Sequence, residues 1–149
     1  MYVSIQEEDF DAGKLMAGLR QSSGCVGAVV SMVGLVRDTH GAEPVSALML
    51  EHYPGMTQRA LESICEQARA RWAILDIAAV HRVGLLRPSE AIVFVGVASV
   101  HRAQAFAACE FVMDQLKTNI PIWKKEQRAH TAVWLEAQGS DLEAQTRWR

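Results

Sequence analysis

The valine-rich stretch at residues 91–100 places the strongest constraint on how this chain can fold. Only Gly96 and Ser99 interrupt its hydrophobic side chains. The stretch is far shorter than the ~20 apolar residues that a membrane-spanning helix requires. Because it follows a turn signal at Pro88 and Ser89 and is rich in β-branched residues, we predict a buried strand here.

Hydrophobic periodicity predicts two helices in the chain. At residues 57–72 apolar side chains recur with a period of about 3.6, and Thr57 is expected to cap this helix. The residues of its apolar face are Leu61, Ile64, Cys65, Ala68 and Trp72. A second helix is predicted at residues 101–118, because Pro121 prevents its continuation. The side chains that it is expected to bury are Ala105, Phe106, Cys109, Val112, Met113 and Leu116.

The remaining elements indicate the fold class. Predicted strands occupy residues 2–6, 25–36, 46–53, 75–83 and 131–136, and a first helix occupies residues 14–21. We expect the strand at residues 25–36 to be long, bent at its glycines and largely buried. Many strands follow one another without a crossover helix, which favours an α+β fold over a parallel sheet. The 149 residues, 50% of them hydrophobic, are expected to form a single domain over residues 1–149.

Charge and cysteine content argue against several classes of protein. A formal net charge of −2 lacks the basic footprint of a general nucleic-acid-binding protein. The three cysteines and five histidines show no spacing that is typical of a metal site. We therefore expect no metal and no cofactor. The acidic N-terminal segment has no feature of a secretory signal, which favours a cytoplasmic protein.

The sequence Ser99-Val100-His101-Arg102 is a candidate anion site, because it lies where the predicted strand meets a helix. Backbone N–H groups at a helix N-terminus, together with His101 and Arg102, can bind a phosphate group. The structural alternative is that Ser99 caps the helix and the other side chains are ordinary surface residues. This motif alone does not decide between the two.

Lys117 and Lys124 flank the predicted turn after the same helix. Lysines at helix ends are usually solvated, and that interpretation stays open. The apolar residues at 120–123 favour a different one, because a lysine held against an apolar surface loses hydration and its pKa falls. Such a lysine can act as an acid, a base or a carbonyl-polarising group.

Arg37 and Met113 each have a functional and a structural interpretation. Arg37 follows a predicted strand and begins a polar loop, where function is often concentrated. A plain arginine at a strand end is an equally good interpretation. By residue type alone, Met113 is expected to fill the core.

Five segments of the chain together match the pattern of a known family. They are LEHYPGM (50–56), RW (71–72), AVHRVG (79–84), IVFVGVASVHRAQAF (92–106) and MDQLKTNIPIWKKE (113–126). The chain resembles the catalytic large subunit of molybdopterin synthase over about residues 25–136. This resemblance implies an α/β hammerhead-type fold, with mixed or antiparallel sheets and about three helices.

The resemblance also implies an activity and its partners. It implies a sulfurtransferase that converts cyclic pyranopterin monophosphate to molybdopterin during molybdenum cofactor biosynthesis. The sulfur would come from the C-terminal Gly-Gly thiocarboxylate of a small ubiquitin-like sulfur-carrier subunit. Two copies of this chain would form a homodimer within a heterotetramer, and no nucleic acid or membrane would take part.

Residue by residue, the resemblance assigns roles to six positions. The implied catalytic residues are Lys117 and Lys124, and the implied substrate-binding residues are Arg37, His101, Arg102 and Met113. Cations suit these reactants, since the cyclic phosphate and the thiocarboxylate are both anionic. Roughly 22 Å of helix separates Arg102 from Lys117, so we expect a composite site built from two protomers.

Two other classes of function remain open at this stage. A non-catalytic binding module for a phosphorylated metabolite would use the helix N-terminus and Arg37, but it would not need Lys117. A structural interaction protein would use the basic segment only to dock an acidic partner. Formation of a sulfur-containing product distinguishes the enzyme from both.

Overall fold

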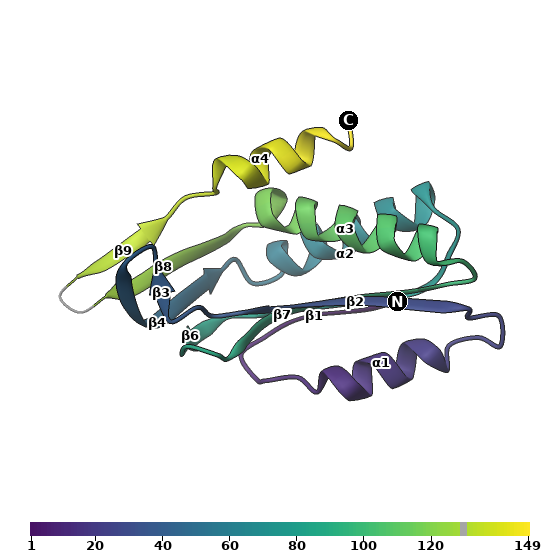
Figure 1. Cartoon of the computed structure of the whole chain (residues 1–149), viewed down its shortest axis with the longest axis horizontal. Helices are drawn as coiled ribbons and strands as arrows, with labels where there is room; N and C mark the ends of the chain where they lie inside the picture. The colour runs from purple at the N-terminus through teal and green to yellow at the C-terminus, as the bar shows by residue number, and fades with distance from the viewer. Residues whose placement is uncertain (129–130) are drawn as a thin grey trace.

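The computed structural model describes residues 1–128 and 131–149. Its first sheet has the strand order β1-β5-β7-β2, with β1 (Tyr2–Gln6), β5 (Ile74–Arg82), β7 (Ala91–Ser99) and β2 (Ala28–Leu35). β1 is parallel to β5, and the other neighbours are antiparallel. Helices α2 (Met56–Arg71) and α3 (Arg102–Asn119) cover one face, and α1 (Ala12–Arg20) covers the other (Figure 1). The predicted α+β class is confirmed.

A second sheet lies at one end of the first (Figure 1). It has the order β3-β4-β8-β9, with β3 (Thr39–His40), β4 (Glu43–His52), β8 (Ile122–Arg128) and β9 (Ala132–Leu135), and β6 (Gly84–Leu86) also pairs with β4. Helix α4 (Gly139–Thr146) follows β9 and packs beside α3. The described residues thus contain four helices, one more than expected.

The central strand β7 organises the core. All residues from Val93 to Ser99 are buried, because helices pack on both faces of the sheet. Val93, Val95 and Val97 join the cluster under α2 and α3. Phe94 and Ala98 face α1 on the opposite side. The predicted buried strand is confirmed.

Helix α2 confirms the periodic pattern, with a correction at its start. The residues that it buries include Leu61, Ile64, Cys65 and Ala68. Its N-cap is Gly55, whose φ of 82° lies in the left-handed region that glycine adopts readily. Thr57 is therefore not the cap: its hydroxyl accepts from the Tyr53 N–H and donates to the Pro121 carbonyl oxygen. These two bonds tie the helix start to the segment before β8.

Helix α3 is confirmed, but it buries a different set of side chains. The buried residues are Ala105, Ala108, Cys109, Phe111, Val112 and Leu116. The expectation for Phe106 is wrong, since this side chain is 60% exposed. Each residue turns the helix by about 100°, which carries position 106 away from the stripe that faces the sheet. Met113 lies half-buried beside that stripe.

Strand β2 is much more exposed than predicted. It begins at Ala28 rather than at residue 25, and its side chains at Ser31, Met32, Val33 and Leu35 are exposed. The physical reason is its position at the sheet edge, where β7 is its paired neighbour. Its apolar composition indicated burial, but an edge strand has fewer neighbours to cover it.

The second sheet contains most of what the sequence did not predict. Residues 122–128 form β8, which pairs with β4 from His52↔Ile122 to Val45↔Arg128, rather than a basic turn. The expected loop after Arg37 contains β3, and the turn after β5 contains β6. Helix α4, after β9, was not predicted at all. These elements are short or rich in charged residues, so hydrophobic periodicity gives little signal for them.

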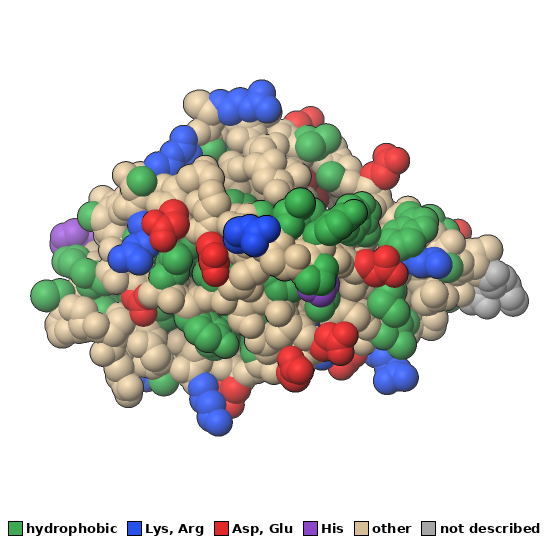
Figure 2. Space-filling model, turned by 180° about the vertical axis from the view of Figure 1, so that it is seen from behind, with side chains coloured by type: hydrophobic (Ala, Val, Ile, Leu, Met, Phe, Trp, Pro, Cys, Tyr) green, Lys and Arg blue, Asp and Glu red, His purple; other side chains and the backbone are tan. Residues whose placement is uncertain are grey.

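Exposed hydrophobic side chains gather on the second sheet. Leu85, Trp123 and Trp134 are 51%, 44% and 52% exposed. Trp123 packs against the exposed Tyr53, with ring centroids 5.4 Å apart. Figure 2 shows hydrophobic side chains gathered toward the end of the molecule where this sheet lies. Such a patch is typical of a surface that contacts another protein.

Gly27→Ala is expected to destabilise the fold. A Cβ atom at this position would lie 2.2 Å from the Val100 carbonyl oxygen, and that backbone joins β7 to α3. Overpacking costs about 1–3 kcal/mol, so we expect the free energy of unfolding in urea to fall by at least that amount. Gly24→Ala is the matched control, because nothing lies within 4 Å of its Cβ position. Equal stability of the two variants contradicts this packing argument.

Candidate functional site

A cavity of about 280 Å³ lies where the second sheet meets the C-terminal end of α3. Its walls come from the end of β2, the β3–β4 hairpin, β8, and the segment between β9 and α4. The charged and histidine side chains that line it are Arg37, His40, Lys117, Lys124, Glu126, Glu136 and Asp141. Apolar lining residues include Leu48, Ile120, Ile122 and Leu135. Polar groups set among apolar walls are typical of small-molecule sites.

Lys124 lies on β8, opposite Leu50 of β4 and Leu135 of β9. Its pKa is lowered to about 8, first because burial disfavours the charged amine and second because Lys117 adds a like charge. Asp141 acts in the opposite direction. An amine with a pKa near 8 is present in both forms close to neutral pH, so it can donate and accept a proton.

Lys117 lies in the last turn of α3 and lines the same cavity, although its side chain is exposed. The buried face of α3 fixes this position, because Leu116 and Val112 anchor the same end of the helix in the core. Carbonyl groups at a helix C-terminus favour a cation there. The cavity therefore contains two lysines from different elements.

Arg37 also lines the cavity, so the structure brings three of the predicted site residues together. The residue before it is held firmly: the Val36 N–H donates to the Glu90 carbonyl, and the Ser89 N–H donates to the Val36 carbonyl. These bonds fix the point at which the Arg37 loop leaves β2. The guanidinium adds a third cation to the lysine pair.

The other predicted site residues do not line this cavity within one chain. His101 and Arg102 are exposed at the opposite end of α3, and His101 is its N-cap without a side-chain capping bond. The Ser99 hydroxyl donates to the Ala73 carbonyl oxygen and accepts from the His101 N–H, but Ser99 is not the helix cap, because the N-cap residue is His101. Met113, on α3, is half-buried and packs against the core cluster between the helices and the first sheet.

Four lining residues were missed by sequence reasoning: His40, Glu126, Glu136 and Asp141. Glu126 follows Lys124 by two residues, so the strand alternation of β8 would have placed both on one face. No local signal marks the other three. Within residues 1–128 and 131–149, no group of three or more His, Cys, Asp and Glu side chains is arranged to hold a metal ion.

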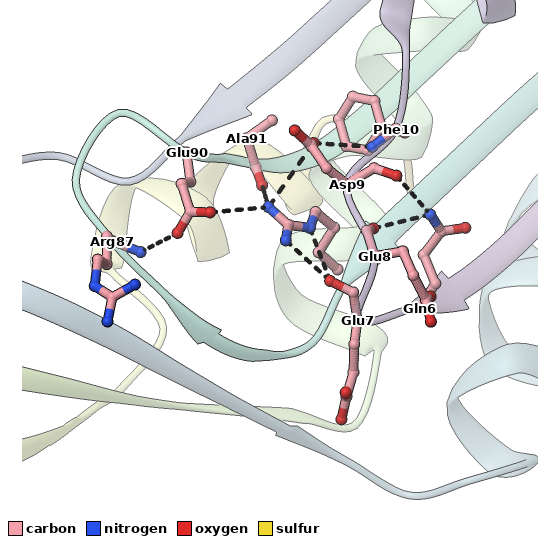
Figure 3. A network of polar contacts seen from close by, with 9 residues as sticks. Gln6, Glu7, Glu8, Asp9, Phe10, Arg87, Glu90 and Ala91 are labelled. Carbon is pink, nitrogen blue, oxygen red and sulfur yellow. Dashed lines mark hydrogen bonds and ion pairs between the residues drawn. The ribbon is translucent and has the colours of Figure 1, made fainter.

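A polar network fixes the chain beside the β6–β7 turn. The guanidinium of Arg82 donates to the Glu7 carbonyl oxygen at 2.9 and 3.1 Å and to the Ala91 carbonyl oxygen at 3.1 Å. The carboxylates of Asp9 and Glu90 lie 3.8 Å from it (Figure 3). A buried arginine needs such partners to offset its lost hydration. The network joins the segment after β1 to the start of β7.

His81, next to Arg82 in the AVHRVG segment, is a buried neutral histidine. Burial lowers its pKa to about 4, although the hydrogen bond from its Nδ1 to the Arg82 carbonyl oxygen acts in the opposite direction. The nearby charges of Lys124 and Lys117 lower the pKa further. At neutral pH this ring therefore adds no charge beside the lysines.

Known proteins with similar sequences share most of this chain. The family model described as "MoaE protein" matches residues 5–119. The molybdopterin synthase catalytic subunit of Ralstonia nicotianae is 51% identical over 146 residues, covering 98% of this chain and 83% of the relative. The protein of the same name from Pseudomonas aeruginosa is 47% identical and covers 99% of both chains.

Solved structures share the fold as well. The molybdopterin biosynthesis MoaE protein of Burkholderia ambifaria has a TM-score of 0.85 and 47% identity, covering 99% of this chain and 97% of that one. A crystal structure of molybdopterin synthase from Staphylococcus aureus has a TM-score of 0.82 and 28% identity, covering 89% and 95%. No helix among the described residues is long and apolar enough to cross a membrane.

Lys117→Met is expected to raise the pKa of Lys124. Methionine keeps most of the side-chain length but removes the like charge that disfavours the protonated amine. The pH dependence of Lys124 acetylation by acetic anhydride, followed by mass spectrometry, gives its titration midpoint. Lys14→Met, on α1, is the control and leaves the midpoint unchanged. An unshifted midpoint in Lys117→Met contradicts the proposed coupling between the two amines.

Proposed function

This chain belongs to the MoaE protein family, and from that membership and its cavity we propose that it is the catalytic subunit of a molybdopterin synthase. In this reaction, sulfur passes from the C-terminal thiocarboxylate of a small ubiquitin-like partner to cyclic pyranopterin monophosphate. Because the dithiolene of the product holds two sulfur atoms and each thiocarboxylate carries one, two successive transfers are needed. Each transfer leaves the partner with a C-terminal carboxylate, whose new oxygen comes from the pterin side chain or from water. No resident cofactor is required for this transfer.

One observation carries the proposal: Arg37, Lys117 and Lys124 line a single cavity of about 280 Å³. Both reactants are anionic, since one carries a cyclic phosphate and the other a thiocarboxylate. Guanidinium and ammonium groups bind such anions by charge-assisted hydrogen bonds. The same cations can stabilise the negative charge that develops on oxygen as sulfur is transferred.

The two lysines differ in a way that suits catalysis. Lys124 has a pKa of about 8 because it is buried beside Lys117, so it can exchange a proton near neutral pH. Lys117 is exposed in the last turn of α3, where it can meet an incoming anion. A binding module for a phosphorylated metabolite needs cations, but it has no use for an amine with a lowered pKa. The enzyme is therefore the better-supported function.

We further propose that the complete site is shared between two protomers. Arg102 and Lys117 lie 15 residues apart on α3, which at 1.5 Å per residue separates their backbones by roughly 22 Å. A small pterin cannot span that distance within one chain. A two-fold dimer brings His101 and Arg102 of one protomer to the cavity of the other, and forms two such sites. In the same arrangement, Met113 is a proposed substrate contact.

The partner's extended tail is proposed to reach the two lysines through the open side of the cavity. Only a thin, glycine-ended chain can carry a thiocarboxylate into a site of this size. Two of these small subunits with two copies of this chain form the proposed heterotetramer, built on a single domain of this chain. The cytoplasm is the proposed compartment, because Cys25, Cys65 and Cys109 are all free thiols.

Sulfur transfer tests the proposed function directly. We expect the dithiolene product when the chain is incubated with the thiocarboxylated partner and cyclic pyranopterin monophosphate. Lys117→Ala is expected to abolish product while leaving the fold intact, because a lysine at a helix end contributes little to stability. A partner without its last two residues should also give no product. Pterin binding without product in the wild-type reaction favours the binding module instead.

Mixed dimers test the shared site. Arg102→Ala and Lys117→Ala each inactivate both sites of a homodimer, but in a heterodimer both changes fall in the same site. The other site is then intact, so verified heterodimers should regain about half of the wild-type specific activity. Heterodimers of two Lys117→Ala subunits with different tags are the control. If the mixed heterodimers stay inactive, the shared-site proposal is wrong, and His101 and Arg102 act only at the N-terminal end of α3.

A further inference from the structure

A buried acid lies beside Lys124 without pairing with it. Glu126 is 5% exposed, lines the cavity, and follows Lys124 by two residues on β8. Alternation along a strand puts both side chains on one face, with their Cα atoms roughly 6.6 Å apart. Two oppositely charged side chains at that spacing can form an ion pair. Among the ion pairs of the described residues, Lys124 nevertheless has none with a carboxylate.

Other partners occupy both oxygens of this carboxylate. Nδ1 of His40 lies 3.1 Å from Oε2, and Nε of Arg128 donates to Oε1 at 2.7 Å. Arg128 also donates to the Glu43 carboxylate at 2.8 Å. A buried carboxylate requires such partners to offset its lost hydration. Both oxygens of Glu126 therefore have nitrogen partners other than the Lys124 amine.

The same contacts fix the β3–β4 hairpin. His40 lies on β3 and Glu43 at the start of β4, and they pair across the tight turn at Gly41, whose φ is 63°. This tip extends past the last β4–β8 pair, Val45↔Arg128. Glu126 and Arg128 therefore join the hairpin tip to β8 through side chains. His40 and Glu126 stand 86 residues apart in the sequence, so only the folded chain brings them together.

We propose that His40 and Arg128 are positioning residues, which engage both oxygens of Glu126 and so prevent this buried acid from pairing with Lys124. This inference rests on the proposed catalytic role of Lys124. An ion pair with Glu126 would favour the charged amine and compete with an anionic substrate for it. The two positioning residues keep the amine available for both proton transfer and substrate binding.

Several charged and titratable groups line the same cavity as Lys124. They are Lys117 from α3, Arg37 from the loop after β2, His40 from β3, Glu126 from β8, and Glu136 and Asp141 from the C-terminal segment. Burial and Lys117 lower the pKa of Lys124, and Asp141 raises it. Glu126 is not among the causes of that shift. If the Glu126 carboxylate were released from His40 and Arg128, its negative charge would raise the pKa of Lys124, in opposition to the effects of burial and Lys117.

Titration of Lys124 in the substrate-free protein tests this arrangement. Competitive acetylation across a pH series, read by mass spectrometry, gives the midpoint of each lysine without any turnover. We expect His40→Ala to raise the Lys124 midpoint by about one pH unit, because an opposite charge then comes within reach. Arg128→Ala, which frees the other oxygen, should act in the same direction. His40→Gln keeps a donor and should restore the wild-type midpoint.

The double variant His40→Ala/Glu126→Gln identifies the cause. It removes the released charge, so the midpoint should return to the wild-type value. Ser46→Ala is the matched control, since it deletes a hairpin contact to the Gln127 carbonyl without touching Glu126. If His40→Ala does not fold, Arg128→Ala decides the same question. Unchanged midpoints in the folded single variants, or a raised midpoint in the double variant, overturn the proposal.

This test is independent of the proposed function. A wild-type protein that fails to transfer sulfur would refute the enzyme assignment, yet the Lys124 midpoints would still report on Glu126. Where sulfur transfer is observed, the kcat–pH profile of His40→Ala should move in parallel with the Lys124 midpoint. A general loss of structure would instead lower kcat at every pH without moving the profile.

Discussion

Lys117 and Lys124 line one cavity, and the charge of Lys117 disfavours the protonated form of the Lys124 amine. Two ammonium groups repel each other, and burial of Lys124 reduces the hydration that would stabilise its charged form, although Lys117 stays exposed. The arrangement persists because each lysine comes from an element anchored elsewhere. The apolar face of α3 fixes one, and the β4–β8 pairing fixes the other. The folding energy of the core therefore opposes the repulsion, and the outcome is an amine with a pKa of about 8.

The first sheet contributes to the main hydrophobic clusters, and the second sheet carries many of the residues that line the candidate site. The first sheet, covered on both faces, supplies the clusters around β7 and carries no side chain of the lysine pair. The second sheet has more exposed side chains, and its polar residues line the cavity together with the C-terminal end of α3. Side-chain networks around Arg82 and Glu126 fix the segments that hydrophobic contacts do not hold. A site of this kind can vary while the core stays unchanged.

Local sequence patterns predicted the first sheet and its helices well, because burial there produces clear periodicity. They failed where burial is partial. Strand β8 is rich in charged residues, so its alternation could not be recognised from hydrophobicity. Residues of β2 were predicted to be buried from their apolar character, but they are exposed because β2 is an edge strand. Helix α4 has no strong apolar face. Resemblance to the family predicted that Arg37 and the lysines belong to one site, and the cavity contains all three. His40 and Glu126 were missed, since their contact depends on tertiary structure alone.

We infer that the cavity lined by Arg37, Lys117 and Lys124 binds the pterin substrate. A crystal structure of the protein with cyclic pyranopterin monophosphate tests it most directly. We expect the pterin in this cavity, with Lys117 and Lys124 within hydrogen-bonding distance of it and His101 and Arg102 of a second protomer on its phosphate. Pterin bound elsewhere, with the two lysines contacting only water, would contradict it.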